Sequence, residues 1–386
     1  MHPNILNTYS RLPISFSHGD GVWLHSTHGE KYFDALCGIA VTGLGHSNKR
    51  FNLALKNQID KGIHYSNLFR IHEQELLAEK LTAISDLSGV FFCNSGCEAN
   101  EAAIKLARLY GSKNNIKNPT IIVFEDSFHG RTMATLSATA SRKAQKGFEP
   151  LLKGFLRMPK NDISKIKGLN NSSIVAILLE PIQGEGGVKH FDKEFLYQLK
   201  LICEQKKWLF IADEVQCGMG RTGYWWSSKK NQISPDVLTS AKGLGNGFPI
   251  GACLTSSKFN DIFEPGNHGS TFGGNPLACV ASLETIKIIE DEKLLDNAKI
   301  QGKKIINQLT SEYKNNSKIK EIRGTGLMIG IEFHEDCSNI NKIALENNVI
   351  LNITSNNILR LLPPLTLKEQ ESDFLVDKII KIINKY

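Results

Sequence analysis

The sequence predicts an α/β protein in which a large domain with a mostly parallel sheet is followed by a smaller α+β domain. Between residues 89 and 254, short apolar runs alternate with glycine-bearing loops and helical patterns, which is typical of parallel sheets flanked by helices. These runs are almost continuously apolar, so we expect both faces of their strands to be covered. After residue 276 the pattern becomes mainly helical with a few further strands, which indicates the second domain.

The predicted elements follow this division along the chain. We expect five strands in the larger sheet, at residues 89–93, 120–124, 174–179, 208–212 and 237–240. For the second domain we expect helices at 277–290 and 294–313, strands at 327–333, 349–352 and 358–362, and a closing helix at 367–386. We therefore divide the chain into an N-terminal segment 1–50 that packs with the small domain, a large domain 51–276, and a small domain 277–386.

Composition excludes several classes of protein. The 386 residues are 41% hydrophobic, enough for a substantial core, but no apolar run approaches the roughly 18 residues that a membrane span needs. Eight scattered cysteines without a C-x-x-C pair favour reduced thiols and a cytoplasmic location, and no secretory signal is expected. Histidine spacing predicts no bound metal. The net charge of +7 is spread along the chain, so we expect neither a nucleic-acid nor a membrane partner.

The loops after the first two predicted strands carry candidate binding groups. Ligands of parallel α/β sheets bind beyond the carboxyl ends of the strands. Residues 94–99 (Asn-Ser-Gly-Cys-Glu-Ala) open a helix whose free N–H groups and dipole suit a phosphate, although an ordinary helix cap also fits this loop. Phe128, His129 and Arg131 follow the second strand. The phenylalanine suits a planar ring and the arginine a carboxylate, but a core phenylalanine and a surface arginine remain alternatives.

The remaining strand ends narrow the chemistry further. The third leads into a glycine-rich loop at 180–187, which allows close approach to a ligand or forms a simple turn. The fourth delivers Asp213 and the fifth is followed by Lys242, and the two residues could form an ion pair. However, a lysine between Ala241 and Gly243 has the access that a Schiff base requires, and a buried aspartate suits a pyridinium nitrogen. Together, the phosphate-binding loop, the ring of Phe128, the carboxylate of Asp213 and the amine of Lys242 are the four groups needed to hold pyridoxal phosphate.

The chain closely resembles the class III aminotransferases among the fold-type I pyridoxal-phosphate enzymes, and within them most closely the acetylornithine aminotransferases. The resemblance runs nearly from end to end and includes residues 21–24, 31–35, 38–41, 44–46, 94–105, 127–132, 180–187, 213–216, 220–223 and 269–276. It implies the fold-type I architecture, with a mostly parallel seven-stranded type of sheet. It also implies a homodimer with pyridoxal 5′-phosphate as cofactor.

Several site residues are implied by this resemblance. Lys242 would bind the cofactor covalently and Asp213 would pair with its ring nitrogen. The other implied cofactor contacts are Gly96 and Cys97 to the phosphate, Phe128 stacked on the ring, Val215 and Gln216 at the ring and its 3-oxygen, and Thr271 reaching the cofactor of the partner subunit. Cys97 replaces the threonine or alanine more usual in the family, which a backbone contact tolerates.

The resemblance also implies a reaction. Arg131, with Ser270 of the partner subunit, would bind the carboxylate of acetylornithine, and Arg360 the α-carboxylate of glutamate, with Glu185 pairing Arg360 in the first half-reaction. The implied transfer takes the δ-amino group of N2-acetyl-L-ornithine to 2-oxoglutarate in arginine biosynthesis, giving N-acetyl-L-glutamate 5-semialdehyde and L-glutamate. Succinylornithine, ornithine, N-succinyldiaminopimelate and 4-aminobutyrate remain alternative donors. A nucleotide-binding α/β protein using the glycines at 243–247 is the alternative from another class.

Overall fold

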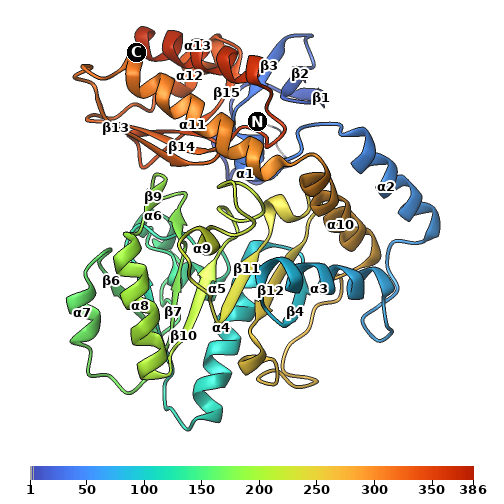
Figure 1. Ribbon diagram of the computed structural model, residues 1–386, viewed down its shortest axis with the longest axis vertical. Coiled ribbons are helices and arrows are strands. Elements are labelled where there is room, and N and C mark those ends of the chain that lie inside the picture. The colour runs from blue at the N-terminus through green and yellow to red at the C-terminus, as the bar shows by residue number, and fades with distance from the viewer. Residues whose placement is uncertain (1, 3) are drawn as a thin grey trace.

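A seven-stranded sheet forms the centre of the computed structural model, which describes residues 2 and 4–386 (Figure 1). Its strand order is β4-β12-β11-β10-β7-β5-β6, and only β12 within this sheet runs antiparallel to its neighbours. The mostly parallel α/β fold is therefore confirmed. The strands are β4 (Gly89–Cys93), β5 (Thr120–Phe124), β6 (Phe155–Met158), β7 (Ile174–Leu179), β10 (Leu209–Asp213), β11 (Val237–Ser240) and β12 (Gly251–Thr255).

Four of the five predicted strands in this sheet have the predicted bounds. The fourth lies at 209–213 instead of 208–212, which makes Asp213 its last residue. Strands β6 and β12 were not predicted. β6 is a half-buried edge strand of four residues that carries Arg157, and β12 begins with a glycine directly after a loop containing Pro249. Neither therefore shows the long apolar run that marks a strand covered on both faces.

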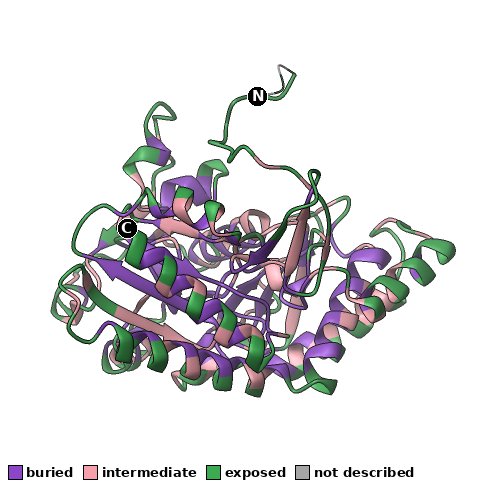
Figure 2. Ribbon diagram, turned by 90° about the horizontal axis from the view of Figure 1, so that it is seen from above, coloured by how far each residue is buried: buried purple, intermediate pink, exposed green. Residues whose placement is uncertain are grey.

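The central sheet buries a separate hydrophobic layer on each face. Helix α4 (Gly96–Lys113) places its small Ala102, Ala103 and Ala107 in one cluster with Ile121 and Val123. Helix α8 (Lys193–Lys206) packs with the alternating residues of the same strand, Ile122 and Phe124, on the other face. Because both members of each alternating pair are covered, the strands read as continuous apolar runs. Figure 2 shows the buried inner faces of the helices and their exposed outer faces.

The remaining helices connect and cover the strands. They are α1 (Cys37–Ala40), α2 (Lys49–Lys61), α3 (His72–Ser85), α5 (Met133–Ala138), α6 (Arg142–Gln145), α7 (Ile163–Lys167), α9 (Ser227–Lys230), α10 (Pro276–Asp291), α11 (Leu294–Glu312), α12 (Ile340–Glu346) and α13 (Glu369–Lys385), with short 3-10 turns at Lys242–Leu244 and Ser257–Phe259. Helix α10 packs on α2 and α3, while α11 packs on α13. In the part of the chain that is described, no helix combines the length and the apolar character needed to cross a membrane.

Two smaller four-stranded sheets lie above the central one in Figure 1. One contains β13 (Ile319–Thr325), β14 (Met328–Phe333), β17 (Ile358–Leu361) and β16 (Asn352–Thr354), in that antiparallel order. The other joins β1 (Phe16–Asp20), β2 (Trp23–Ser26) and β3 (Lys31–Asp34) to β15 (Val349–Ile350), which runs parallel to β3. The N-terminal strands are thus tied to the C-terminal part by main-chain hydrogen bonds. A two-stranded ribbon, β8 (Ile182–Gln183) with β9 (Lys189–His190), completes the sheets.

The second part of the chain differs in detail from the prediction. The expected strand 349–352 is divided between two sheets, because β15 pairs with β3 and β16 pairs with β17. Strand β13 was not predicted, since it carries charged residues at three of its first five positions, Lys320, Glu321 and Arg323, and is only partly buried. The helices at 277–290 and 294–313 match α10 and α11 to within one residue at each end. The division into domains at residues 50 and 276 stays a prediction.

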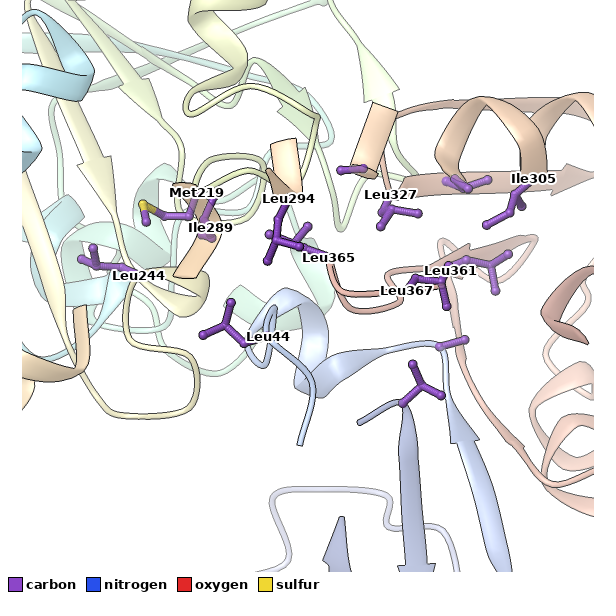
Figure 3. Close-up of a cluster of buried hydrophobic side chains, with 14 of the residues drawn as sticks. Leu44, Met219, Leu244, Ile289, Leu294, Ile305, Leu327, Leu361, Leu365 and Leu367 are labelled. Carbon is purple, nitrogen blue, oxygen red and sulfur yellow. The ribbon is translucent and has the colours of Figure 1, made fainter. Parts of the chain in front are cut away.

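A shared core joins the central sheet to the C-terminal part. Figure 3 shows a run of buried side chains contributed by segments far apart in the sequence, including Leu44, Met219, Leu244, Ile289, Leu294, Leu327 and Leu365. The buried Arg221 guanidinium adds hydrogen bonds to the carbonyl oxygens of Leu327, at 3.1 Å, and Pro363. Burial lowers the pKa of Arg221 to about 10, so it remains charged at neutral pH. This junction fixes the strand that carries Arg360 relative to the strand ends that carry Asp213 and Lys242.

Candidate active site

A cavity of about 290 Å³ lies where β4, β5, β7, β10 and β11 end. It is lined by seven of the residues predicted from the sequence, namely Gly96, Cys97, Phe128, Asp213, Val215, Gln216 and Lys242. They come from the carboxyl ends of four strands: Gly96 and Cys97 begin the helix after β4, Phe128 follows β5, Asp213, Val215 and Gln216 lie at or after the end of β10, and Lys242 follows β11. The sheet topology therefore brings together residues separated by as many as 146 positions, counting from 96 to 242.

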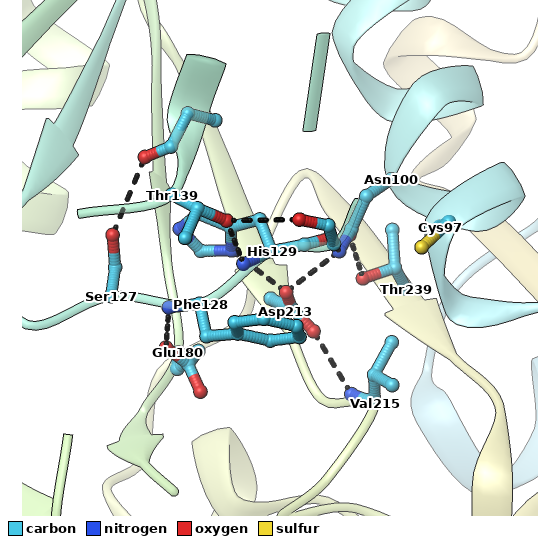
Figure 4. Close-up of polar contacts among 12 residues, drawn as sticks. Cys97, Asn100, Ser127, Phe128, His129, Thr139, Glu180, Asp213, Val215 and Thr239 are labelled. Carbon is cyan, nitrogen blue, oxygen red and sulfur yellow. Dashed lines mark hydrogen bonds and ion pairs between the residues drawn. The ribbon is translucent and has the colours of Figure 1, made fainter. Parts of the chain in front are cut away.

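Asp213 is held by donors on both of its carboxylate oxygens (Figure 4). Its Oδ2 atom accepts hydrogen bonds from Asn100 Nδ2 and His129 Nδ1, both at 2.8 Å, and Oδ1 accepts from the Val215 N–H at 3.1 Å. Asp213 is only 2% exposed, so its carboxylate has little contact with bulk water. These three contacts hold the carboxylate in one orientation.

The support for Asp213 includes residues that the sequence did not reveal. Asn100 is buried on α4, where its Oδ1 atom accepts from Thr239 Oγ1 at 2.7 Å and its Nδ2 atom also donates to the His129 carbonyl at 2.8 Å. Asn100 thus joins α4, the loop after β5, β10 and β11. The sequence carries one signal for a role of Asn100, because this polar residue lies among the alanines that form the buried face of α4.

The start of α4 provides a cradle for an anion. Ser95 caps the helix by accepting from the Glu98 N–H at 3.2 Å, whereas the N–H groups of Gly96 and Cys97 come too early in the helix to have an intrahelical acceptor. A Cβ atom at Gly96 would lie 2.7 Å from Val215 Cγ1, so only glycine allows this close approach. The free N–H groups and the positive end of an 18-residue helix favour a phosphate here.

Lys242 begins the 3-10 turn after β11, with a φ of 48°, and its side chain lines the cavity. Burial lowers the pKa of Lys242 from the usual lysine range, and the nearby Arg360 charge acts in the same direction. Glu185 opposes part of this effect. A lowered pKa increases the neutral fraction of the amine, which is the nucleophilic and proton-accepting form.

Glu185 and Arg360 form an ion pair beside the cavity, with 2.7 Å between Glu185 Oε1 and Arg360 Nη1. Gln216 contacts both partners, because its Oε1 accepts from Arg360 at 3.0 Å and its Nε2 lies 3.4 Å from Glu185 Oε1. Burial acts to raise the pKa of Glu185, but the charges of Arg360 and Lys242 outweigh it and the pKa is lowered. Arg360 is fully buried, and its Nη2 atom has no hydrogen-bond partner among the residues described.

Glu180 is a second buried carboxylate at the cavity that the sequence did not single out. Its Oε1 atom accepts from the Phe128 N–H at 2.8 Å and its Oε2 atom from the Gly184 N–H at 3.3 Å. Burial, together with the nearby charge of Asp213, raises the pKa of Glu180 well above its usual range. Glu180 therefore fixes the position of Phe128 relative to the 180–187 loop.

A second cavity of about 350 Å³ contains the predicted Arg131. Phe128 lines both cavities, so we call this one the outer cavity and the first the inner cavity. The Arg131 guanidinium lies over the Phe128 ring at 5.5 Å from its centroid, and Glu185 also lines the outer cavity. The predicted Ser270 and Thr271 line neither. Ser270 Oγ instead accepts from Asn94 Nδ2 at 3.2 Å, and Thr271 is exposed.

Known proteins resemble this chain over its whole length. The family described as "Aminotransferase class-III" matches residues 5–383. An acetylornithine aminotransferase from Nitrosomonas europaea is 51% identical over 382 residues, covering 98% of this chain and 97% of the relative. A protein of the same name from Methanothermobacter thermautotrophicus is 42% identical over 380 residues, covering 98% and 96%.

Solved structures give the same result for the fold. The ornithine aminotransferase of Toxoplasma gondii superimposes with a TM-score of 0.96 at 30% identity, covering 99% of this chain and 93% of that one. A second structure of the Toxoplasma enzyme, with a TM-score of 0.94 at 30% identity and coverage of 98% and 92%, has pyridoxal phosphate at partial occupancy in its active site. The acetylornithine aminotransferase of Elizabethkingia anophelis superimposes with a TM-score of 0.88 at 32% identity, covering 99% and 96%. The chain therefore belongs to the class-III aminotransferase family, whose cofactor is pyridoxal 5′-phosphate.

Proposed function

We propose that this chain transfers the δ-amino group of N2-acetyl-L-ornithine to 2-oxoglutarate, giving N-acetyl-L-glutamate 5-semialdehyde and L-glutamate. The observation that carries the proposal is the 2.7 Å ion pair of Glu185 with the buried Arg360 beside the Lys242 cavity. A δ-amine donor has no carboxylate on its reacting carbon. Without Glu185, Arg360 would therefore be a buried charge with no partner while this donor is bound. The relatives named acetylornithine aminotransferase, at 42–51% identity, support the same donor.

The residues of the inner cavity fit pyridoxal phosphate. The cradle at Gly96 and Cys97, which a Cβ atom would fill, suits the phosphate, and Asp213 suits the protonated ring nitrogen. Phe128 and Val215 supply apolar surfaces for the ring, Gln216 a polar contact, and Lys242 the amine for covalent attachment. When bound, the cofactor supplies an electron sink for the carbon that loses its proton.

The chain's own groups then perform the remaining tasks. Asp213, held in place by Asn100 and His129, would pair with the ring nitrogen of the bound cofactor. Lys242, whose pKa is lowered by burial, accepts the proton from the donor carbon as a general base. Arg131 in the outer cavity binds the carboxylate at the far end of the donor.

The acceptor requires a different arrangement at Arg360. 2-Oxoglutarate carries a carboxylate next to its reacting carbon, and the free Nη2 of Arg360 offers it a donor. When Glu185 leaves, the Nη1 atom becomes available as well, which permits a bidentate contact. Arg360 thus pairs with Glu185 in the half-reaction of the amino donor, and with the carboxylate of the substrate in the half-reaction of 2-oxoglutarate.

A panel of amino donors with 2-oxoglutarate tests the proposed function. We expect kcat/KM for N-acetyl-L-ornithine to exceed that for L-ornithine and 4-aminobutyrate by at least about tenfold. L-ornithine carries an ammonium group beside its far carboxylate, and 4-aminobutyrate is one carbon shorter between the reacting amine and the carboxylate. Preference for ornithine or 4-aminobutyrate would overturn the assignment of the donor while leaving the aminotransferase class intact.

Asn100→Ala should weaken cofactor binding. The substitution removes one of two donors to Asp213 Oδ2 and leaves the buried Thr239 hydroxyl without its partner. A hydrogen bond to a charged group contributes roughly 1.5–3 kcal/mol, so the cofactor Kd should rise by about tenfold or more. Kd is measured by titrating apoenzyme with the cofactor, and the melting temperature of the apoenzyme reports the structural cost separately. The exposed Asn52→Ala is the control, and an unchanged Kd in Asn100→Ala would refute the role.

We further propose a cytoplasmic homodimer in which Thr271 reaches the cofactor phosphate of the partner subunit. Thr271 lies in an exposed loop, and large apolar side chains near it are also exposed, with Leu68 at 88% and Phe272 at 61%. The two segments are in contact, because Asn67 Nδ2 donates to the carbonyl oxygens of Ser270 and Gly273 at 2.9 Å. An exposed apolar surface of this kind favours a second copy of the chain.

Thr271→Ala should weaken cofactor binding roughly tenfold without dissociating the dimer, since it removes one hydrogen bond to a dianionic phosphate. Sedimentation measures the assembly and apoenzyme titration measures the affinity, while Thr271→Ser should restore most of it. A fully active monomer at assay concentration would contradict the proposal.

A further inference from the structure

The outer cavity contains two cations without a carboxylate partner. Besides Arg131, it is lined by Lys143 of α6, which the reaction described above does not use. In the described part of the chain, neither side chain forms an ion pair with a carboxylate. The cavity therefore has more positive charge than a donor with a single carboxylate can match.

The two carboxylates of the outer cavity are already neutralised. Asp126 pairs with Lys189 at 2.9 Å, and Glu185 pairs with Arg360 at 2.7 Å. They are therefore poor counterions for Arg131 and Lys143. The unmatched charge that remains at this cavity is cationic, and the complementary ligand group is a carboxylate.

Hydrogen bonds fix the main-chain segments that carry Lys143 and Arg131. The buried Gln145 donates from Nε2 to the carbonyl oxygens of Thr139 at 2.7 Å and Leu136 at 3.1 Å, which anchors α6 to α5. Ser141 caps α6 by accepting from the Ala144 N–H at 3.2 Å. The Arg131 N–H donates to Cys97 Sγ at 3.3 Å, which ties that loop to α4. Lys143 and Arg131 thus extend from two separately anchored segments into one cavity.

We propose that Lys143 is a specificity-determining residue that binds a second carboxylate of the amino donor. The proposal rests on the function given above. N-acetylornithine brings one carboxylate to the outer cavity, which Arg131 binds. A donor whose acyl arm ends in a carboxylate brings two, and the second pairs with Lys143. The chain then accepts dicarboxylic N-acyl donors of the succinyl type in addition to the acetyl donor.

The test compares N-succinyl-L-ornithine with N-acetyl-L-ornithine in the donor half-reaction of the holoenzyme. In Lys143→Met, the ratio of kcat/KM for the succinyl donor to that for the acetyl donor should fall about fivefold, the upper range for an exposed ion pair. The loss should lie in KM, and it should shrink as salt is added. Lys143→Arg should retain most of the ratio. The control is Lys146→Met, at the exposed C-terminal end of α6 and outside the cavity.

Equilibrium binding separates recognition from turnover. N-succinyl-L-norvaline and N-acetyl-L-norvaline lack the reacting amine, and the preference for the succinyl compound should fall by the same factor in Lys143→Met. Equal ratios in Lys143→Met and Lys146→Met would overturn the role of Lys143, as would a wild-type enzyme that uses the acetyl donor but not the succinyl donor. If neither donor reacts with the wild-type enzyme, the proposed function itself fails.

Discussion

Lys242→Ala is expected to reduce turnover by about a thousandfold or more, while the cofactor still binds without a covalent link. The substitution removes both the amine that attaches the cofactor and the base that moves the donor's proton, and proton transfer by a positioned side chain contributes roughly 10²–10⁴-fold. The cradle at Gly96 and Cys97 and the Asp213 carboxylate remain in place to hold the cofactor.

Two measurements check this expectation. Single-turnover absorbance with N-acetyl-L-ornithine gives the rate, and borohydride reduction followed by mass spectrometry shows whether the cofactor is attached. The wild-type chain should gain the mass of the reduced cofactor on the peptide containing Lys242, and Lys242→Ala should not. Lys146→Ala serves as the control lysine. Wild-type turnover in Lys242→Ala would remove this lysine from the mechanism.

Glu185→Gln is expected to shift the preference between donors toward L-glutamate by about one to two orders of magnitude. The substitution removes the negative charge that pairs with Arg360 Nη1 at 2.7 Å, while Gln216 remains as a neutral contact at 3.0 Å. Arg360 then stays available to an α-carboxylate throughout the cycle. A charge-assisted contact is worth roughly 1.5–3 kcal/mol, which corresponds to the stated range.

Separate single-turnover rates with N-acetyl-L-ornithine and L-glutamate measure this shift. The opposing explanation is that Glu185 only shapes the glycine-rich loop, in which case both half-reactions would slow alike. The exposed Glu194→Gln on α8 controls for a general change in charge. An unchanged ratio of the two rates in Glu185→Gln would exclude a switching role for the pair.

The strands covered on both faces could be predicted because both sides of each strand are apolar. In β5, Ile121 and Val123 face one hydrophobic layer, and Ile122 and Phe124 face the other. The edge strand β6 and the charged β13 lack that signal, since solvent covers part of each. The segment 349–352 was predicted as one strand because its sequence does not show that two sheets share it.

The candidate site divides in a similar way. Asp213 and Lys242 could be predicted because each comes directly at or after the end of a strand, where parallel sheets bind ligands. Asn100 could not be, because its partners Asp213, His129 and Thr239 meet it only when four elements assemble. That Lys143 and Arg131 line the same cavity likewise depends on the packing of α6 against α5.

The most direct test of the central proposal follows the transferred nitrogen. The holoenzyme is supplied with 2-oxoglutarate and N2-acetyl-L-ornithine that carries a heavy-nitrogen label only at the δ-position, and the products are analysed by mass spectrometry. The proposed reaction predicts that the label appears in the α-amino group of glutamate in equal amount to the semialdehyde formed. Glutamate without label, or label released as ammonia, would contradict it.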